Sequence, residues 1–217
     1  LVIDDNSPDG TGALADARAQ SDDHIHVLHR TEKNGLGPAY LAGFKWALEN
    51  DFELIIEMDA DGSHRAEDLA LLIQRAEMAD KPDLVIGSRW ISGGATQGWS
   101  QKRVLLSRAG NVYINLALGL NVRDATAGFR VYRADLLRRM DLNKVEALGY
   151  GFQVNMTLLV YQVGGRIVEM PITFLEREAG ESKLSGGIFT EELKLVTRWG
   201  VKHRGKQLRQ ALGKMRK

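Results

Sequence analysis

The chain has 217 residues, of which 44% are hydrophobic and 26% are charged, as in an ordinary globular protein. It contains no cysteine, which excludes disulfide bonds and thiolate zinc sites. No uninterrupted apolar run reaches about 18 residues, so we expect no segment that spans a bilayer. The net charge of +1 hides an asymmetry, because residues 193–217 hold nine Lys or Arg and no acid.

The first 90 residues alternate between strand and helix patterns. Apolar runs at 1–3, 24–30, 53–58 and 83–90 predict strands, and amphipathic patterns at 10–20, 38–50 and 65–79 predict helices. Strands that alternate with helices predict an α/β fold with a mainly parallel central sheet flanked by helices.

The pattern changes after Trp90. We expect a loop at 91–101, a long helix at 102–120, a turn, strand and helix at 124–139, and a helix at 151–165. A strand at 166–177 contains Pro171, which favours an edge or bulged strand. A polar loop at 178–187 and a helix at 188–205 follow.

Polar residues follow three of the predicted strands, with the sequences "DDNSPDG", "DADGS" and "GSRW". Ligands of open α/β sheets bind at the carboxyl ends of the strands. Asp59 and Asp61, one residue apart, can converge on a hard cation such as Mg²⁺ or Mn²⁺. The alternative is a solvated turn or a helix cap, because aspartate favours both.

Asp4 and Asp5 allow the same two interpretations. The residues after them favour a turn, and Asp4 is compatible with a structural role there. Asp5 is the better candidate for a ligand contact, where its carboxylate would accept a hydrogen bond from a nucleobase or a ribose hydroxyl.

Seven motifs together resemble family 2 glycosyltransferases, and more narrowly their dolichol- and polyprenol-phosphate mannose synthases. They are "VIDDNSPDGT", "NGLGPAYLAGF", "EMDADGSH", "VIGSRW", "DATAGFRVY", "GYGFQVNM" and the "RE-AGESKL" pattern. The resemblance runs from residue 2 to about 200, which implies a GT-A domain at 1–200 and a basic tail at 201–217. It also implies a first strand ahead of Leu1, so we expect the sequence to be truncated at its N-terminus.

The resemblance further implies transfer of mannose from GDP-mannose to a polyprenyl monophosphate, with Mg²⁺ or Mn²⁺ as cofactor and inversion at the anomeric carbon. Matched by position, the donor-binding residues are Ile3, Asp5, Asp59, Ala60, Asp61, Arg89, Arg177 and Lys183. The metal-binding residues are Asp59, Asp61 and Ser63, and the acceptor phosphate would meet Arg103 and Ser107. Asp61 and Arg103 are the two residues to which the resemblance gives catalytic roles.

Each basic residue also has a structural interpretation. Arg103 begins a predicted helix and is compatible with a solvated position, although Ser107 shares its helical face. Arg177 and Lys183 flank a polar loop that could simply be exposed. Arg130 could contact the acceptor or pair with Asp124, and the internal pair is favoured.

The basic C-terminal segment predicts an anionic partner. Its apolar residues, Leu195 and Trp199 among them, fit an amphipathic helix at a membrane surface or a helix packed on the body. Sparse aromatic interleaving argues against nucleic acid. We therefore expect a peripheral enzyme at the cytoplasmic membrane face, and a membrane-embedded partner protein is compatible with that location. The alternatives are a sister transferase with another donor, such as UDP-glucose, and a sugar-nucleotide-binding module without turnover.

Overall fold

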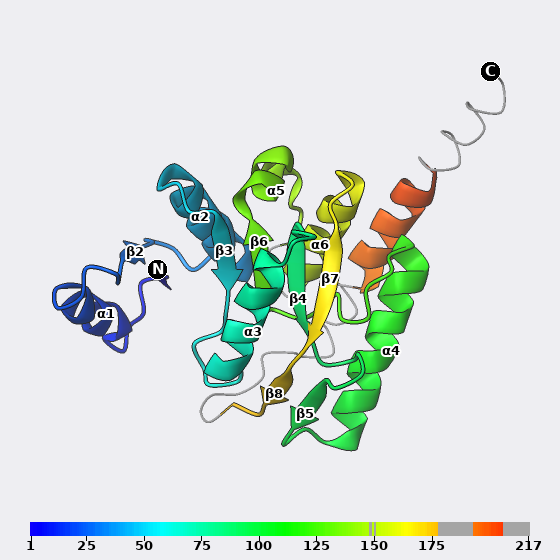
Figure 1. Cartoon of the computed structure of the whole chain (residues 1–217), viewed down its shortest axis with the longest axis horizontal. Coiled ribbons are helices and arrows are strands. Elements are labelled where there is room, and N and C mark those ends of the chain that lie inside the picture. Colours follow the sequence, from blue (N-terminus) through cyan, green and yellow to red (C-terminus); the bar gives the residue numbers. More distant parts are fainter. Residues whose placement is uncertain (148, 150, 178–192, 206–217) are drawn as a thin grey trace.

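The computed structural model describes residues 1–147, 149, 151–177 and 193–205. Eight strands and six labelled α-helices alternate along this part of the chain (Figure 1). The strands are β1 (Val2–Asp4), β2 (Val27–His29), β3 (Leu54–Glu57), β4 (Leu84–Ser88), β5 (Ala95–Gln97), β6 (Arg130–Arg133), β7 (Ile167–Pro171) and β8 (Thr173–Leu175). The helices are α1 (Thr11–Ala19), α2 (Leu36–Glu49), α3 (Ala66–Glu77), α4 (Gln101–Leu118), α5 (Ala134–Arg139) and α6 (Phe152–Gln162), and a 3₁₀ turn covers Leu142–Lys144.

The central sheet has the strand order β3-β6-β4-β7. β6 is antiparallel to both of its neighbours, whereas β4 and β7 are parallel, so three of the four strands run in one direction. Two smaller parallel sheets, β1-β2 and β5-β8, complete the fold. The predicted α/β class and its mainly parallel sheet are therefore confirmed. Pro171 ends β7 at the edge of the central sheet, as its sequence position favoured.

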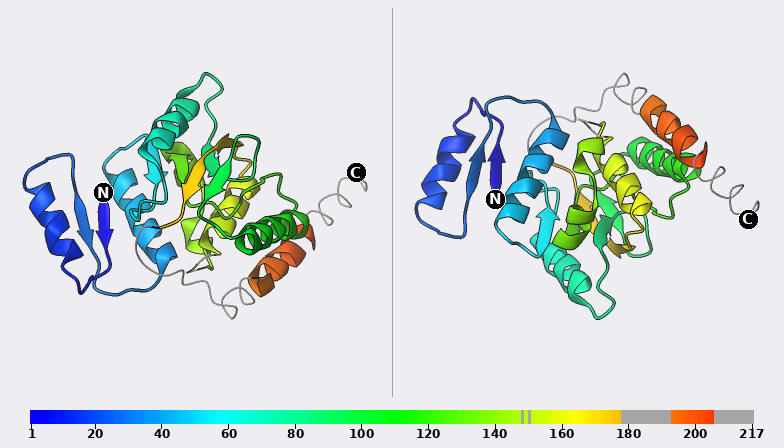
Figure 2. Two further views of the ribbon diagram at one scale, coloured as in Figure 1. Left: turned by 90° about the horizontal axis from the view of Figure 1, so that it is seen from below. Right: turned by 90° about the horizontal axis from the view of Figure 1, so that it is seen from above.

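Alternate residues of β4 point to opposite faces of the sheet, and each face has its own core. Leu84 and Ile86 belong to a large cluster with residues of α2, α4, α5 and α6. Val85 packs with Leu72 and Ala76 of α3 on the other face. Helices thus cover both faces of the sheet, which gives three layers (Figure 2).

The loop expected at 91–101 contains the short strand β5, which the sequence analysis missed. β5 pairs in parallel with β8, and Glu176, just after β8, donates its backbone N–H to the carbonyl of Gln97 at 2.9 Å. β5 has three residues, only one of them apolar, so no periodic pattern identifies it.

A helix at 193–205 packs side by side with α4 (Figure 2). The hydroxyls of Tyr113 and Thr197 are 2.5 Å apart, and the indole N–H of Trp199 donates to Glu146 at 3.0 Å. Trp199 is only 4% exposed. The ring of Trp199 belongs to the protein core, which decides between the two interpretations of this helix in favour of packing on the body. Residues 206–217 of the predicted tail lie outside the described residues.

Candidate functional site

Asp59 and Asp61 lie in the turn after β3, at the carboxyl end of the strand. Ser63 shapes this turn, because its N–H and hydroxyl both donate to Asp61 Oδ1, at 3.1 and 2.5 Å. Gly62 has φ +77°, a backbone conformation that favours glycine. Ser63 is fully buried, whereas both aspartates keep some exposure. The turn therefore presents two carboxylates to the outside and keeps its supporting serine inside.

His64 supports the same turn from the protein side. Its Nδ1 accepts the backbone N–H of Asp59 at 3.0 Å, which leaves the proton of a neutral ring on Nε2. The ring stacks on Phe129 with centroids 4.6 Å apart. Burial lowers the pKa of His64, so the neutral form is favoured. His64 thus fixes the backbone of Asp59.

Arg177 contacts the turn from the segment after β8. Its Nε lies 2.8 Å from Asp61 Oδ2. Partial burial alone would raise the pKa of Asp61, but the hydrogen bonds from Ser63 and the charge of Arg177 outweigh it and lower this pKa. Asp61 is therefore a carboxylate anion at neutral pH, as a metal ligand requires.

Arg103 lies in the first turn of α4 and extends toward Glu176, the residue before Arg177. Its Nη1 is 2.7 and 2.8 Å from the two carboxylate oxygens of Glu176. The guanidinium also lies over the indole of Trp99, with Cζ 3.8 Å from the ring centroid. Ser107 follows one turn later, and both residues are partly exposed. Arg103 is therefore held by an acid and an aromatic ring and is not simply solvated.

β8 joins these two groups of residues. The N–H of Leu175 donates to the carbonyl of Ser63 at 3.0 Å, which attaches the strand to the Asp59–Asp61 turn. The next two residues contact different halves of the site, because Glu176 meets Arg103 and Arg177 meets Asp61. The predicted acceptor residue and the predicted metal residue are thus linked through two consecutive positions.

Arg89 leaves the end of β4 and is only 7% exposed. It donates Nε and Nη2 to the two oxygens of Asp124 at 2.7 Å each, and its backbone N–H donates to the same carboxylate at 3.0 Å. The predicted pair of Asp124 with Arg130 was therefore wrong. Arg130 is fully buried and donates instead to the carbonyls of Ala125 and Ala127.

A buried acid, Glu57, lies at the end of β3, two residues before Asp59. Burial raises the pKa of Glu57 to about 8. The nearby charge of Arg130 and the hydrogen bond from Gln153 act in the opposite direction but are outweighed. Gln153 and Asp59 approach each other across Gly128, where an added Cβ atom would lie 3.8 Å from the Gln153 amide nitrogen and 4.0 Å from the Asp59 carboxylate. Glu57 was not among the predicted site residues, although a charged residue inside an apolar strand was a usable signal.

The remaining predicted donor residues are Ile3, Asp5, Ala60 and Lys183. Ile3 of β1 packs toward Gly43 of α2, and Asp5 forms an ion pair with Arg30 at 3.0 Å. Ala60 is exposed in the Asp59–Asp61 turn. Lys183 lies outside the described residues. The structure therefore brings Asp59, Asp61, Ser63 and Arg177 together, and their roles toward a donor stay predictions.

The donor set of the turn fits a hard divalent cation. Asp59 and Asp61 offer carboxylate oxygens, which Mg²⁺ and Mn²⁺ prefer, whereas the predicted third ligand, Ser63, is buried and donates its hydroxyl to Asp61 Oδ1. Among the described residues there is no cluster of three His, Cys, Asp or Glu side chains suited to a metal. Two carboxylates suit a cation that takes its remaining ligands from substrate phosphates and water.

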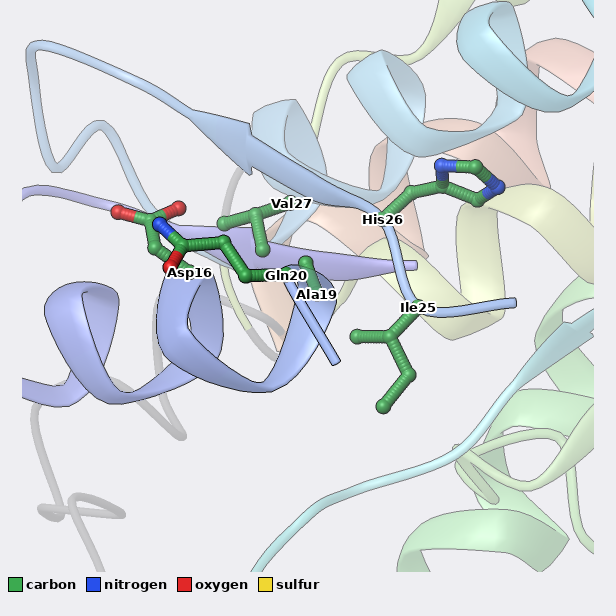
Figure 3. A pocket seen from close by; sticks show the side chains of 6 residues that line it. All are labelled: Asp16, Ala19, Gln20, Ile25, His26 and Val27. Atoms are coloured by element: carbon green, nitrogen blue, oxygen red, sulfur yellow. The ribbon is translucent and has the colours of Figure 1, made fainter. Parts of the chain in front are cut away.

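A hollow of about 470 Å³ lies elsewhere, between α1 and β2 (Figure 3). It is lined by Asp16, Ala19, Gln20, Ile25, His26 and Val27. None of these residues belongs to the predicted donor or acceptor sets. We therefore locate the candidate site by its chemistry at the strand ends and not by this hollow.

Comparisons with known proteins identify the family. The sequence model of glycosyl transferase family 2 matches residues 1–141. The chain belongs to this family. It is 55% identical to an undecaprenyl-phosphate mannosyltransferase of Micrococcus luteus, over 98% of this chain and 86% of that protein. It is 47% identical to a polyprenol monophosphomannose synthase of Mycolicibacterium smegmatis, over 94% of this chain and 77% of that protein.

Solved structures of glucosyl-3-phosphoglycerate synthase from Mycobacterium tuberculosis share the fold. The complex with phosphoglyceric acid has a TM-score of 0.61 at 16% identity, covering 94% of this chain and 68% of that one. A complex with Mn²⁺ and UDP-glucose has a TM-score of 0.60 at 16% identity and similar coverage. At this identity the likeness is one of fold, and the predicted GT-A architecture is confirmed.

The Arg89–Asp124 pair yields a stability prediction. Asp124→Ala would leave a buried guanidinium unpaired, so we expect the free energy of unfolding to fall by about 3–5 kcal/mol in urea titrations. Glu49→Ala is the control, because the Lys45–Glu49 pair is exposed, and it should change stability by less than about 1 kcal/mol. Equal losses in the two variants would contradict the prediction.

Proposed function

We propose that the chain transfers mannose from GDP-mannose to a polyprenyl monophosphate, giving polyprenyl phosphate mannose and GDP. The observation that carries this proposal is the 55% identity to an undecaprenyl-phosphate mannosyltransferase over 98% of the chain. The polar residues at the strand ends support it, since they combine a carboxylate pair with separate cationic residues.

The proposed chemistry is a single displacement. An oxygen of the acceptor phosphate attacks the anomeric carbon, and the bond from that carbon to the GDP oxygen breaks, so the configuration inverts. A phosphate is already anionic near neutral pH, with a second pKa of about 6, and needs no dedicated base. This agrees with a site whose one nearby histidine, His64, is occupied in holding the Asp59 backbone.

Each group of residues has a stated task. Asp59 and Asp61 would hold Mg²⁺ or Mn²⁺, which would neutralise charge on the leaving diphosphate, and Ser63 would position Asp61 through its two hydrogen bonds. Arg177 brings a further positive charge to the same place through its contact with Asp61. Arg103 and Ser107 bind the acceptor phosphate, and Ile3 and Asp5 would contact the nucleotide.

The outer face of α4 supports a membrane location. Leu105, Val112 and Leu116 are 70%, 58% and 71% exposed and recur at helical spacing. Lys102 and Arg108 flank this apolar stripe and are exposed too. Apolar residues edged by basic ones suit the interface of a bilayer with anionic lipid, where the acceptor resides.

The same helix carries Arg103 in its first turn, on the face that turns away from the stripe and toward Glu176, so lipid contact would bring this proposed acceptor residue near the membrane while it stays on the protein side. No described helix is long and apolar enough to cross a membrane. We propose peripheral attachment at the cytoplasmic face.

The activity test uses labelled donors. The protein is incubated with Mn²⁺, polyprenyl phosphate and radiolabelled GDP-mannose or UDP-glucose, and label is counted in the lipid phase. We expect lipid-linked mannose from GDP-mannose, and loss of at least about 100-fold in rate for Asp61→Ala, because this carboxylate is absent from the variant. Label from UDP-glucose alone would indicate a sister transferase. Donor binding without lipid-linked product would indicate a module without turnover.

The membrane test uses the α4 stripe. Replacing Leu105 and Leu116 by serine should weaken binding to vesicles of phosphatidylcholine and phosphatidylglycerol by about tenfold, because less apolar area enters the bilayer. Leu14→Ser with Leu71→Ser is the matched control, since both leucines are exposed on other helices. Equal vesicle binding by the two double variants in a sedimentation assay would refute the role of α4.

A further inference from the structure

Glu176 is a conspicuous acid in a region that would bind two phosphate-bearing substrates. Nothing in the motif comparison gave it a role, yet both of its carboxylate oxygens accept from Nη1 of Arg103. We propose that Glu176 is a positioning residue for the acceptor phosphate, which it serves by orienting Arg103. The inference rests on the proposed function, since it concerns the acceptor of that reaction.

The backbone around Glu176 is well fixed. Its N–H donates to the carbonyl of Gln97, and β8 before it pairs with β5. The neighbouring Gly98 has φ +85°, and a Cβ atom there would lie 2.7 Å from the Cβ of Glu176. The close approach of these two strands therefore sets the place from which the carboxylate reaches Arg103.

This arrangement restricts the guanidinium from two sides. Glu176 holds one end through Nη1, and the ring of Trp99 lies beneath its plane. Nε and Nη2 donate no hydrogen bond to any described residue, so these groups are left for a ligand. A guanidinium with one edge held and another edge offered suits an oxyanion, because phosphate accepts two parallel N–H groups.

The charge of Glu176 acts against a phosphate, so the balance of the two effects matters. The side chains of Arg103 and Glu176 are 34% and 44% exposed, and solvent at such positions screens the repulsion. Arginine otherwise loses much rotational freedom when it binds a ligand, and prior orientation removes that cost. Positioning therefore outweighs repulsion.

Glu176 and Arg177 are neighbours in the sequence but contact different residues of the site. Consecutive residues reach the two halves of the site, and Arg177 contacts Asp61 on the donor side. The acceptor arginine and the metal-site aspartate are thus placed relative to each other by one short segment of backbone.

Steady-state kinetics on the whole chain test the proposal. In Glu176→Gln we expect the KM for polyprenyl phosphate to rise about tenfold, while kcat and the KM for GDP-mannose stay within about twofold. Glu176→Asp keeps the charge and should recover part of the lost affinity. A merely structural role would not produce a change confined to the acceptor KM.

Asp80→Asn is the matched control. Asp80 also binds an arginine with both oxygens, Arg75 at 2.7 and 2.8 Å, but it lies before the start of β4, at the end away from Arg89. This variant should have wild-type kinetics. An acceptor KM in Glu176→Gln that is unchanged or lower, or a donor KM that rises equally, would overturn the proposal.

A binding measurement separates this inference from the proposed function. Geranyl phosphate is titrated calorimetrically into protein that contains GDP and Mn²⁺. About tenfold weaker binding by Glu176→Gln supports the positioning role even if the wild type transfers no mannose, which would refute the activity alone. Equal binding by both proteins, or no binding by the wild type, overturns the role of Glu176.

Discussion

The buried ion pair of Arg89 and Asp124 is the constraint on which the carboxyl edge of the sheet depends. Asp124 accepts three hydrogen bonds from Arg89 and has its own N–H held by Glu169 of β7. The guanidinium of Arg89 also donates to Thr126, which accepts from Asn111 of α4. One pair therefore fastens β4, β7 and α4 together at the edge where the candidate site lies.

An aromatic layer lies over this pair and supports Arg103, the residue proposed to bind the acceptor. Arg89 is within 5.5 Å of the ring centroids of Trp90, Trp99 and Phe174. The ring of Trp99 in turn supports Arg103, and Phe174 belongs to β8. The buried Arg89 therefore does more than pair with Asp124. It also packs against the ring of Trp99, on which Arg103 lies. Burial of Arg89 also argues for a structural share in its role, beside the donor contact that the family resemblance implies.

Local sequence patterns predicted most of the elements and the turn that holds Asp59 and Asp61. The apolar run before Asp59 and the oxygen ligands after it are short-range signals, and the structure places Asp59, Asp61 and Ser63 in one turn. The partner of Asp124 was not predictable, because Arg89 and Arg130 are both available in the sequence and tertiary packing selects between them. The two interpretations of Trp199 could not be separated for a related reason, since an apolar helix face does not reveal whether protein or lipid covers it. Glu176 was not predicted as a site residue, because its contact is with Arg103, which lies 73 positions away in the sequence.

We propose that the donor diphosphate and its cation bind at the turn after β3, which holds Asp59 and Asp61. Anomalous diffraction from crystals grown with Mn²⁺ and GDP tests this most directly. We expect an anomalous peak between the carboxylates of Asp59 and Asp61, with diphosphate density beside it. Bound GDP with its Mn²⁺ peak at other residues, or with no peak at these aspartates, would show that the donor and its cation bind elsewhere.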